Sequence, residues 1–162
     1  MTVDTLQLDR LSVEIVISSS QSELILLSRS LLDFHLSEAN DGRVTDLGGF
    51  AASTFKRGIN FINIPTTLLA MVDASVGGKT GINFGGLKNE VGVFNDSKFV
   101  ILDTEFLKTL DAENICSGYA EMLKHGLIST EAMWEELVSF DLDKPDLKQL
   151  QRMVGDSVKV KE

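Results

Sequence analysis

One nearly uncharged stretch, residues 62–82, constrains this chain more than any other feature. Its twenty-one residues, INIPTTLLAMVDASVGGKTGI, contain only two charges, Asp73 and Lys79. A charge among apolar neighbours loses hydration, so it persists where a partner or a ligand compensates the loss. Two interpretations stay open. The first is an internal Asp73–Lys79 ion pair that organises a glycine turn, and the second is a ligand site whose flanking glycines let the ligand approach the backbone closely.

The GGKT run within this stretch does not have the spacing of a phosphate-binding loop. In nucleotide hydrolases with that loop, a glycine stands six residues before the lysine, whereas here that position is Asp73. A carboxylate there would repel the phosphate that such a loop holds. No segment fits the G-x-G-x-x-G dinucleotide fingerprint after a strand either. Both common nucleotide motifs are therefore excluded.

The composition of the chain restricts the partners that it can bind. Its 162 residues carry 15 basic and 24 acidic side chains, and the resulting formal net charge of −9 argues against nucleic-acid binding. No run reaches the ~18 apolar residues of a membrane-spanning helix. The N-terminus lacks a secretion signal, so no membrane association and a cytoplasmic location are expected. One cysteine and two histidines exclude a structural zinc site made only of Cys and His.

Apolar periodicity predicts an α/β arrangement that is followed by helices. Strands are expected at residues 12–17, 61–64 and 99–102, and helices at residues 21–35 and 44–55. Further helices are expected at residues 104–109, 112–128, 130–140 and 146–161. The turn at Asp103 then divides an α/β part, residues 1–103, from a helical part, residues 104–162.

Two further groups of polar residues are candidates for binding. In GGLKN, Lys88 and Asn89 place a cation and an amide donor just beyond a flexible turn, and with Lys79 they form a candidate anion site. In GYAEMLKHG, Glu121, Lys124 and His125 stand at i, i+3 and i+4 on adjoining parts of one helix face. Either Glu121 and His125 reach one metal ion, or Glu121 pairs with Lys124. Spacing alone favours the ion pair.

Several separated motifs of the chain closely resemble 3-dehydroquinate synthase, a lyase of the shikimate pathway in aromatic amino acid biosynthesis. They are RGINFINIPTTLLAMVDASVGGKTGIN, GLKN, DTEFLKTL and GYAEMLKHG, in this order. The resemblance implies a dinucleotide-binding α/β domain, partial within residues 1–103, followed by the start of a helical metal- and substrate-binding domain. It also implies conversion of a sugar phosphate, 3-deoxy-D-arabino-heptulosonate 7-phosphate, to 3-dehydroquinate and phosphate, with catalytic NAD and a divalent metal, zinc or cobalt.

The resemblance assigns roles to individual residues. It implies cofactor contacts at Asp46, Thr66, Thr67, Asp73, Lys79, Lys88, Phe106, Leu107, Lys108 and Thr109. It implies substrate-binding or catalytic roles for Lys79, Lys88, Asn89, Lys124 and Arg57. Arg57 matches an arginine that reaches the substrate phosphate, and a homodimer in which it crosses the interface is left open. Glu121 matches the one carboxylate metal ligand of the family. The resemblance therefore favours a metal ligand at Glu121, whereas spacing alone favours an ion pair with Lys124.

The sequence departs from the family pattern at both ends. Only Gly42 remains of the three glycines that begin the family's cofactor turn, and no residues follow Glu162 to supply the two histidines that complete its metal site. Neither His35 nor His125 occupies a ligand position. Because a catalytic zinc normally needs three protein ligands, we expect a shortened family member whose isolated chain lacks synthase activity.

Two alternatives to a shortened synthase stay open. The first is a non-catalytic nucleotide- or anion-binding remnant or subunit. The second is a related enzyme, either another sugar-phosphate cyclase or a metal-dependent polyol dehydrogenase. The GGKTGIN and GLKN motifs favour a cyclase over a dehydrogenase.

Overall fold

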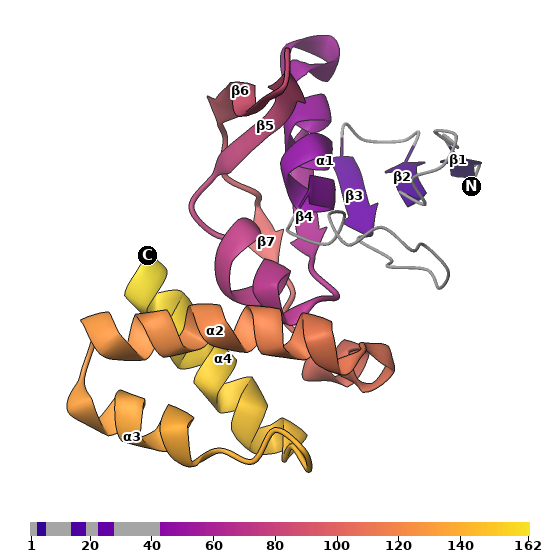
Figure 1. Cartoon of the computed structure of the whole chain (residues 1–162). Coiled ribbons are helices and arrows are strands. Elements are labelled where there is room, and N and C mark those ends of the chain that lie inside the picture. The colour runs from indigo at the N-terminus through magenta and orange to yellow at the C-terminus, as the bar shows by residue number, and fades with distance from the viewer. Residues whose placement is uncertain (1–2, 6–13, 19–22, 28–42) are drawn as a thin grey trace.

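A mixed five-stranded sheet forms one side of the α/β part (Figure 1). The computed structural model describes residues 3–5, 14–18, 23–27 and 43–162. The strands are β1 (Val3–Thr5), β2 (Glu14–Ser18), β3 (Glu23–Leu27), β4 (Asn60–Ile64) and β7 (Phe99–Val100), in the order β1-β2-β3-β4-β7. The pairs β1–β2 and β2–β3 are antiparallel, whereas β3–β4 and β4–β7 are parallel. The strands predicted at residues 12–17 and 61–64 are confirmed where described, and the third is shorter than predicted.

The helix predicted over residues 21–35 is wrong where the structure describes it. Glu23–Leu27 form β3, which pairs with β2 on one side and with β4 on the other. Its sequence, ELILL, has the length of a buried strand, and so short an apolar run does not distinguish a strand from a helix. Hydrogen-bonded pairing with β2 and β4 makes this segment a strand rather than a helix. The rest of the predicted range lies outside the described residues.

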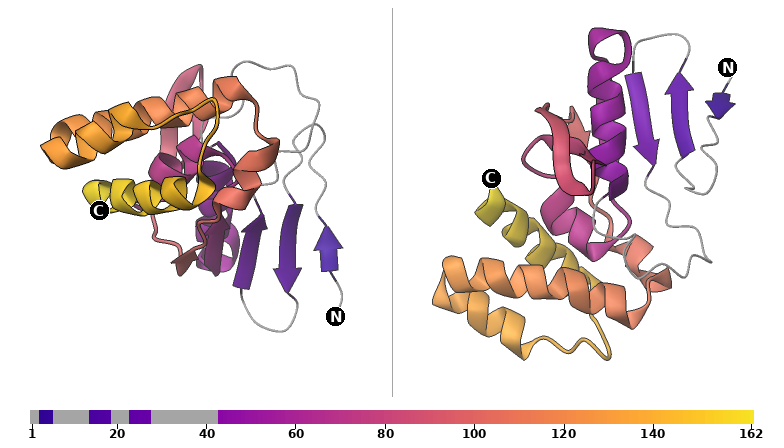
Figure 2. Two further views of the ribbon diagram at one scale, coloured as in Figure 1. Left: turned by 90° about the horizontal axis from the view of Figure 1, so that it is seen from below. Right: turned by 45° about the horizontal axis from the view of Figure 1, so that its top comes forward.

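The first described helix, α1 (Arg43–Thr54), lies between the sheet and a β-hairpin (Figure 2). It confirms the helix predicted over residues 44–55. The hairpin pairs β5 (Lys79–Phe84) antiparallel with β6 (Leu87–Phe94) and turns at two glycines whose φ angles are +61° and +83°. A Cβ atom on Gly49 would lie 2.5 Å from Thr80 of β5 and 3.4 Å from Phe61 of β4. Glycine therefore lets α1 contact both sheets.

The helical part consists of a 3-10 helix, η3 (Thr104–Thr109), and three α-helices, α2 (Ala112–Ile128), α3 (Glu131–Ser139) and α4 (Leu147–Lys161). These bounds confirm the four predicted helices to within one residue at each end. The residue before each helix, namely Asp103, Asp111, Thr130 or Asp146, accepts hydrogen bonds from backbone N–H groups of the first turn. Such caps satisfy donors that a helix leaves unpaired at its start. Within the described ranges, none of the helices has the length and apolar character needed to cross a membrane.

The segment between β4 and β5 packs into the core of the helical part. Leu68, Met71 and Val72 have no exposed surface, and they lie in one cluster with Tyr119 and Met122 of α2 and with residues of α3 and α4. Within this segment, η2 (Ala70–Ala74) is a single π-helical turn. The residues around Asp73 are thereby held between the α/β part and the helices. The division of the chain at residue 103 into two domains stays a prediction.

Candidate functional site

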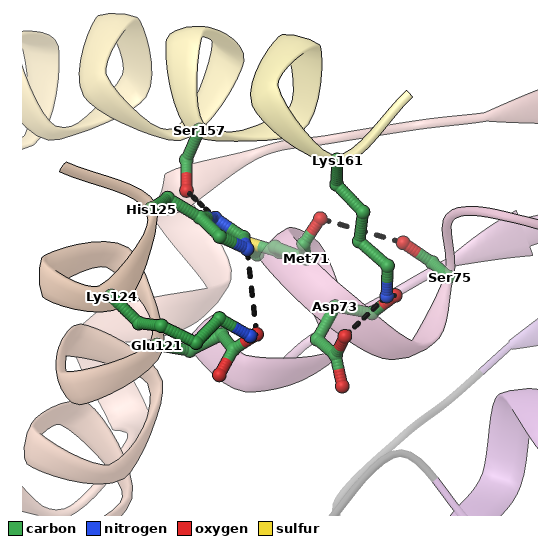
Figure 3. Close-up of polar contacts among 8 residues, drawn as sticks. All are labelled: Met71, Asp73, Ser75, Glu121, Lys124, His125, Ser157 and Lys161. Carbon is green, nitrogen blue, oxygen red and sulfur yellow. Dashed lines mark hydrogen bonds and ion pairs between the residues drawn. The ribbon is translucent and has the colours of Figure 1, made fainter. Parts of the chain in front are cut away.

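The candidate site lies where η2 meets α2 and α4 (Figure 3). The π turn is closed by a hydrogen bond of 3.0 Å from the Ser75 N–H to the Ala70 carbonyl, and π turns occur frequently at functional sites. From this turn, Asp73 meets Lys161 in the last turn of α4, whose ammonium donates to both a carboxylate oxygen and the backbone carbonyl of Asp73. The first of the two interpretations of this stretch, an Asp73–Lys79 ion pair, is not formed, since Asp73 pairs with Lys161 instead.

A second carboxylate and a second lysine belong to the same electrostatic cluster. The pKa of Asp46, in the first turn of α1, is raised to about 6, first by burial and then by the negative charge of Asp73. The positive charges of Lys161 and Lys88 oppose this rise in the pKa of Asp46. The fold thus brings the predicted residues Asp46, Asp73 and Lys88 within electrostatic reach of one another.

Replacing Asp46 with asparagine is expected to remove part of the pH dependence of stability between about pH 4 and pH 7. The folded pKa of Asp46, about 6, exceeds the usual value of 3.8 for an aspartate. The folded state therefore binds the proton more tightly. The stability that this carboxyl contributes is present below the unfolded pKa and is lost as the pH rises through the folded pKa. In urea unfolding, Asp46→Asn should gain stability relative to the unsubstituted chain as the pH rises.

The control for this measurement is Asp143→Asn, in the exposed loop between α3 and α4. It should leave the slope of unfolding free energy against pH unchanged. An unchanged slope in Asp46→Asn would show that the carboxyl is not coupled to folding in this way.

The three polar residues predicted to share a face of α2 contact one another, and one of them also contacts α4. Lys124 donates to Glu121 Oε1, which forms the ion pair expected from spacing. His125 is buried, with Nε2 3.4 Å from the same Glu121 oxygen and Nδ1 2.6 Å from Ser157 Oγ of α4. Burial lowers the pKa of His125, with Glu121 acting in the opposite direction. A neutral ring protonated at Nε2 satisfies both neighbours, because Ser157 can then donate to Nδ1.

Other residues of the predicted anion and cofactor site lie on the hairpin and in the loop after β4. Lys79, Lys88 and Asn89 are exposed on β5 and β6. The backbone N–H of Asn89, which has a φ of 55°, donates to Asn83 Oδ1 across the turn. Thr67 is buried and accepts a hydrogen bond from the Ala70 N–H, so its hydroxyl helps to start the turn that carries Asp73. Thr66 is half-buried beside it.

The remaining predicted residues, in η3 and η1, are not part of the electrostatic cluster around Asp46 and Asp73. In η3, Leu107 is buried in the helical core and Phe106 is exposed, while Lys108 pairs with Glu105 and Thr109 donates to the Phe106 carbonyl. Arg57 lies in η1 (Phe55–Arg57), beyond the far end of α1 from Asp46. Asp46 and Thr54, the last residue of α1, are eight residues apart, which is about 12 Å along the helix axis. Arg57 lies beyond that end, so the fold does not bring Arg57 of the same chain to Asp46.

Two residues of the site were missed in the sequence analysis, Lys161 and Ser157. Both lie on α4, one turn apart, and Lys161 reaches a carboxylate 88 positions earlier in the sequence. The sequence signal for α4 was its helical periodicity alone, which indicates which residues share a face but not what the face contacts. Only the packing of α4 against η2 reveals their partners.

The arrangement offers anion binding and hydroxyl recognition more readily than metal binding. Ammonium groups of Lys88 and Lys161 can neutralise phosphate or carboxylate groups, and the carboxylates of Asp46 and Asp73 can accept hydrogen bonds from hydroxyls. In the part of the chain that the structure describes, no group of three or more His, Cys, Asp or Glu side chains could hold a metal ion.

Comparison with known proteins gives one family for this sequence. Residues 29–117, more than half of the chain, match the family model described as 3-dehydroquinate synthase N-terminal. The chain is 60% identical over 121 residues to the 3-dehydroquinate synthase of Parabacteroides distasonis, covering 75% of this chain and 34% of the relative. It is 44% identical over 153 residues to that of Caulobacter vibrioides, covering 89% of this chain and 41% of the relative. The chain thus spans about a third of the length of the first of these relatives.

Solved structures of related cyclases share the fold. A 2-epi-5-epi-valiolone synthase from Streptomyces hygroscopicus, solved with NAD+ and Zn2+ bound, has a TM-score of 0.68 and 33% identity, covering 74% of this chain and 34% of its own. A 2-deoxy-scyllo-inosose synthase complexed with carbaglucose-6-phosphate, NAD+ and Co2+ has a TM-score of 0.67 and 29% identity, with the same coverage of 74% and 34%. The fold class predicted from the sequence, α/β followed by α, is confirmed.

Proposed function

This chain belongs to the 3-dehydroquinate synthase family, and on that premise we propose that it forms the cofactor- and substrate-binding part of a sugar phosphate cyclase. The observation that carries the proposal is the convergence of Asp46, Asp73, Lys88 and Lys161 between the α/β part and the helices. The proposed reaction converts 3-deoxy-D-arabino-heptulosonate 7-phosphate to 3-dehydroquinate and phosphate. The cytoplasmic location predicted from the sequence belongs to the same proposal.

The residues of the cluster fit a dinucleotide cofactor. Asp46 and Asp73 supply acceptors for ribose hydroxyls, and Lys88 supplies a cation for a pyrophosphate. Outside the cluster, the exposed Phe106 of η3 offers a ring surface that a base or a nicotinamide can contact. Such a cofactor, NAD in the solved neighbours, would supply reversible hydride transfer when bound. In our proposal, the role of this chain is to bind and orient that cofactor.

The described residues do not fit a complete metal site. Glu121, which the resemblance matches to a metal ligand, shares Oε1 with Lys124 and approaches His125. No further carboxylate, imidazole or thiolate in the described ranges joins it to make a set of three, the usual number of protein ligands for a catalytic zinc. We therefore assign no step of the reaction to a metal held by this chain alone.

The hairpin supplies the charges that the substrate needs. Lys79 is exposed at the start of β5, opposite Phe94, whereas Lys88 and Asn89 are exposed beside the turn on β6. The two ammonium groups therefore lie toward opposite ends of the hairpin, where each can meet a different anionic group. A sugar phosphate would otherwise be repelled by a chain with a net charge of −9. We propose that these residues hold the phosphate and carboxylate of the substrate, with Lys124 and Lys161 contributing from the helices.

Calorimetric titration with NAD tests the cofactor part of the proposal. Lys88→Ala should weaken binding about tenfold, which corresponds to about 1.4 kcal/mol, because it removes a cation near Asp46. Lys144→Ala, in the exposed loop between α3 and α4, is the matched control and should bind as the unsubstituted chain does. Absence of NAD binding at millimolar concentration would overturn the proposal.

The incomplete metal set favours a second candidate function, a nucleotide- or anion-binding subunit without activity of its own. Release of phosphate from the heptulosonate substrate, with NAD and zinc added, distinguishes the two. We expect no turnover by this chain alone. Turnover that is lost in Lys79→Ala would show that the chain is a complete catalyst, and the second candidate would then be wrong.

A homodimer is part of the proposal because of where Arg57 lies. It is exposed beyond the end of α1 and has a positive φ of 71°, as does its neighbour Lys56 at 48°. Exposed apolar residues of the adjacent hairpin, including Phe84 and Phe94, offer contact surface for a second subunit. Sedimentation velocity should show a dimer, and a monomer at all concentrations would exclude this arrangement.

A further inference from the structure

A short series of side-chain hydrogen bonds joins the β5–β6 hairpin to α1. Asn95, the residue directly after β6, donates from its side-chain amide to Ser53 Oγ at 2.8 Å. Ser53 in turn donates to the Gly49 carbonyl, one turn earlier in α1, at 2.6 Å. Asn95 and Ser53 are half-buried and stand 42 positions apart in the sequence. Their bond is therefore a specific tertiary contact rather than a product of local turn geometry.

The donors and acceptors of this series fit in one direction only. A serine hydroxyl has one proton, and Ser53 gives it to Gly49, so its oxygen can only accept from position 95. The amide of Asn95 supplies that donor, whereas a carboxylate of the same size could not. The backbone N–H of Asn95 also donates to the Gly78 carbonyl at 2.8 Å, just before β5. Asn95 thus ties both strands at the open end of the hairpin to α1.

The residues of α1 that meet the hairpin share one face of the helix. Asp46, Gly49 and Ser53 stand at i, i+3 and i+7. Ser53 contacts the open end of the hairpin through Asn95, and Gly49 lies against Thr80, the second residue of β5. The hairpin consequently lies along this face of α1 (Figure 2).

The third residue of this face, Asp46, responds to the other end of the hairpin. Lys88 stands beside the turn of the hairpin, next to the pair formed by Phe84 and Leu87, and its charge opposes the rise in the pKa of Asp46. Because the two strands are paired with each other from the open end to the turn, a rotation at the open end also moves the turn. The contacts at Ser53 therefore affect where the ammonium of Lys88 lies.

We propose that Asn95 and Ser53 are positioning residues, whose hydrogen bond fixes the open end of the hairpin on α1 and so holds Lys88 beside Asp46. This inference rests on the proposed function, in which Lys88 and Asp46 contact the cofactor. It extends that function to two residues that touch neither cofactor nor substrate. Gly49 completes the contact, because its lack of a side chain lets the hairpin lie directly on the helix.

The test begins with Ser53→Ala, which removes the acceptor for Asn95 and is compatible with folding because alanine is the best helix former. Carboxyl titration by NMR should show the pKa of Asp46 rising above about 6, since Lys88 moves away from it. The dissociation constant for NAD should rise about threefold. This effect is smaller than the tenfold rise expected for Lys88→Ala, because the charge is displaced rather than removed.

Two controls separate positioning from a purely structural role. Ser53→Thr keeps the hydroxyl and should leave the titration of Asp46 and the NAD affinity unchanged. Thr54→Ala removes a comparable bond within α1, from the Thr54 hydroxyl to the Phe50 carbonyl at 2.9 Å, at an exposed position. It should likewise leave both measurements unchanged. Asn95→Ala should reproduce the effects of Ser53→Ala, and the double variant should show no larger effect than either substitution alone.

The decisive comparison repeats Ser53→Ala in a chain that already carries Lys88→Ala. No further change in the pKa of Asp46 is expected there, because the substitution acts through Lys88. An equal rise in both backgrounds would overturn the proposal, since the substitution would then act on the burial of Asp46. An unchanged pKa of Asp46 in Ser53→Ala alone would also overturn it.

Failure of the proposed function is read separately from failure of this inference. If the unsubstituted chain binds no NAD, the proposed function is wrong, but the titration of Asp46 still decides whether Ser53 and Asn95 position Lys88. If NAD binds and the titration is the same in all variants, the proposed function stands and the positioning role is excluded.

Discussion

Replacing Gly118 with alanine is expected to lower the free energy of unfolding by about 2 to 3 kcal/mol. Gly118 lies in α2 where this helix crosses the segment before η2. A Cβ atom there would stand 2.4 Å from the Leu69 nitrogen and 2.6 Å from Leu68 Cβ. The first of these contacts is with backbone, so the two segments must move apart. That movement would open the core around Leu68 and displace Asp73 from the helices.

The same change at Gly155 serves as the control for Gly118→Ala. Gly155 lies within α4, and a Cβ atom built on it meets nothing within 4 Å. Alanine there should raise stability by about 0.5 to 1 kcal/mol, since alanine favours a helix interior over glycine. Urea unfolding followed by circular dichroism measures both variants. Equal effects of the two substitutions would contradict the close helix crossing.

Lys161→Met is expected to lower the free energy of unfolding by about 1 to 2 kcal/mol, because it removes hydrogen bonds between an ammonium and Asp73 at a partly buried position. The side chain of Lys161 is 21% exposed and that of Asp73 is 43% exposed. The pKa of Asp46 should also rise above its present value of about 6, since Lys161 opposes that rise. Carboxyl titration by NMR measures the second effect.

Lys159→Met is the matched control, two residues earlier on α4. It removes a pair with Asp156 in which the two side chains are 74% and 54% exposed. Such exposed pairs contribute about 0.5 kcal/mol or less. If both methionine variants behaved alike in unfolding and left the titration of Asp46 unchanged, Lys161 would have no special role in the site.

The helices from residue 104 onward were predictable because their signals are local. Each is preceded by Asp or Thr that caps its first turn, as Asp111 accepts from the Asn114 N–H and Thr130 from the Met133 N–H. Apolar residues then recur at helical spacing. A cap and a period are both contained in a few consecutive residues, so tertiary contacts were not needed to place these ends.

The strand at Glu23–Leu27 shows the limit of that approach. Its apolar residues fit a helical period over the longer range that the sequence suggested, but they pair with β2 and β4. The partner strand β4 is more than thirty residues away in the sequence. Non-local pairing of this kind overrides local propensity, because the sheet satisfies backbone groups on both sides of the strand.

The sequence by itself determined the family and the fold class. It also identified Asp73 and Lys79 as the two charged residues of the apolar stretch 62–82. Only the tertiary structure decided that Asp73 pairs with Lys161 rather than with Lys79, and that burial, with the nearby charge of Asp73, raises the pKa of Asp46. The reason is physical. Residue type and helical period are local properties, whereas the partner of a desolvated charge depends on which distant element the core packs against it.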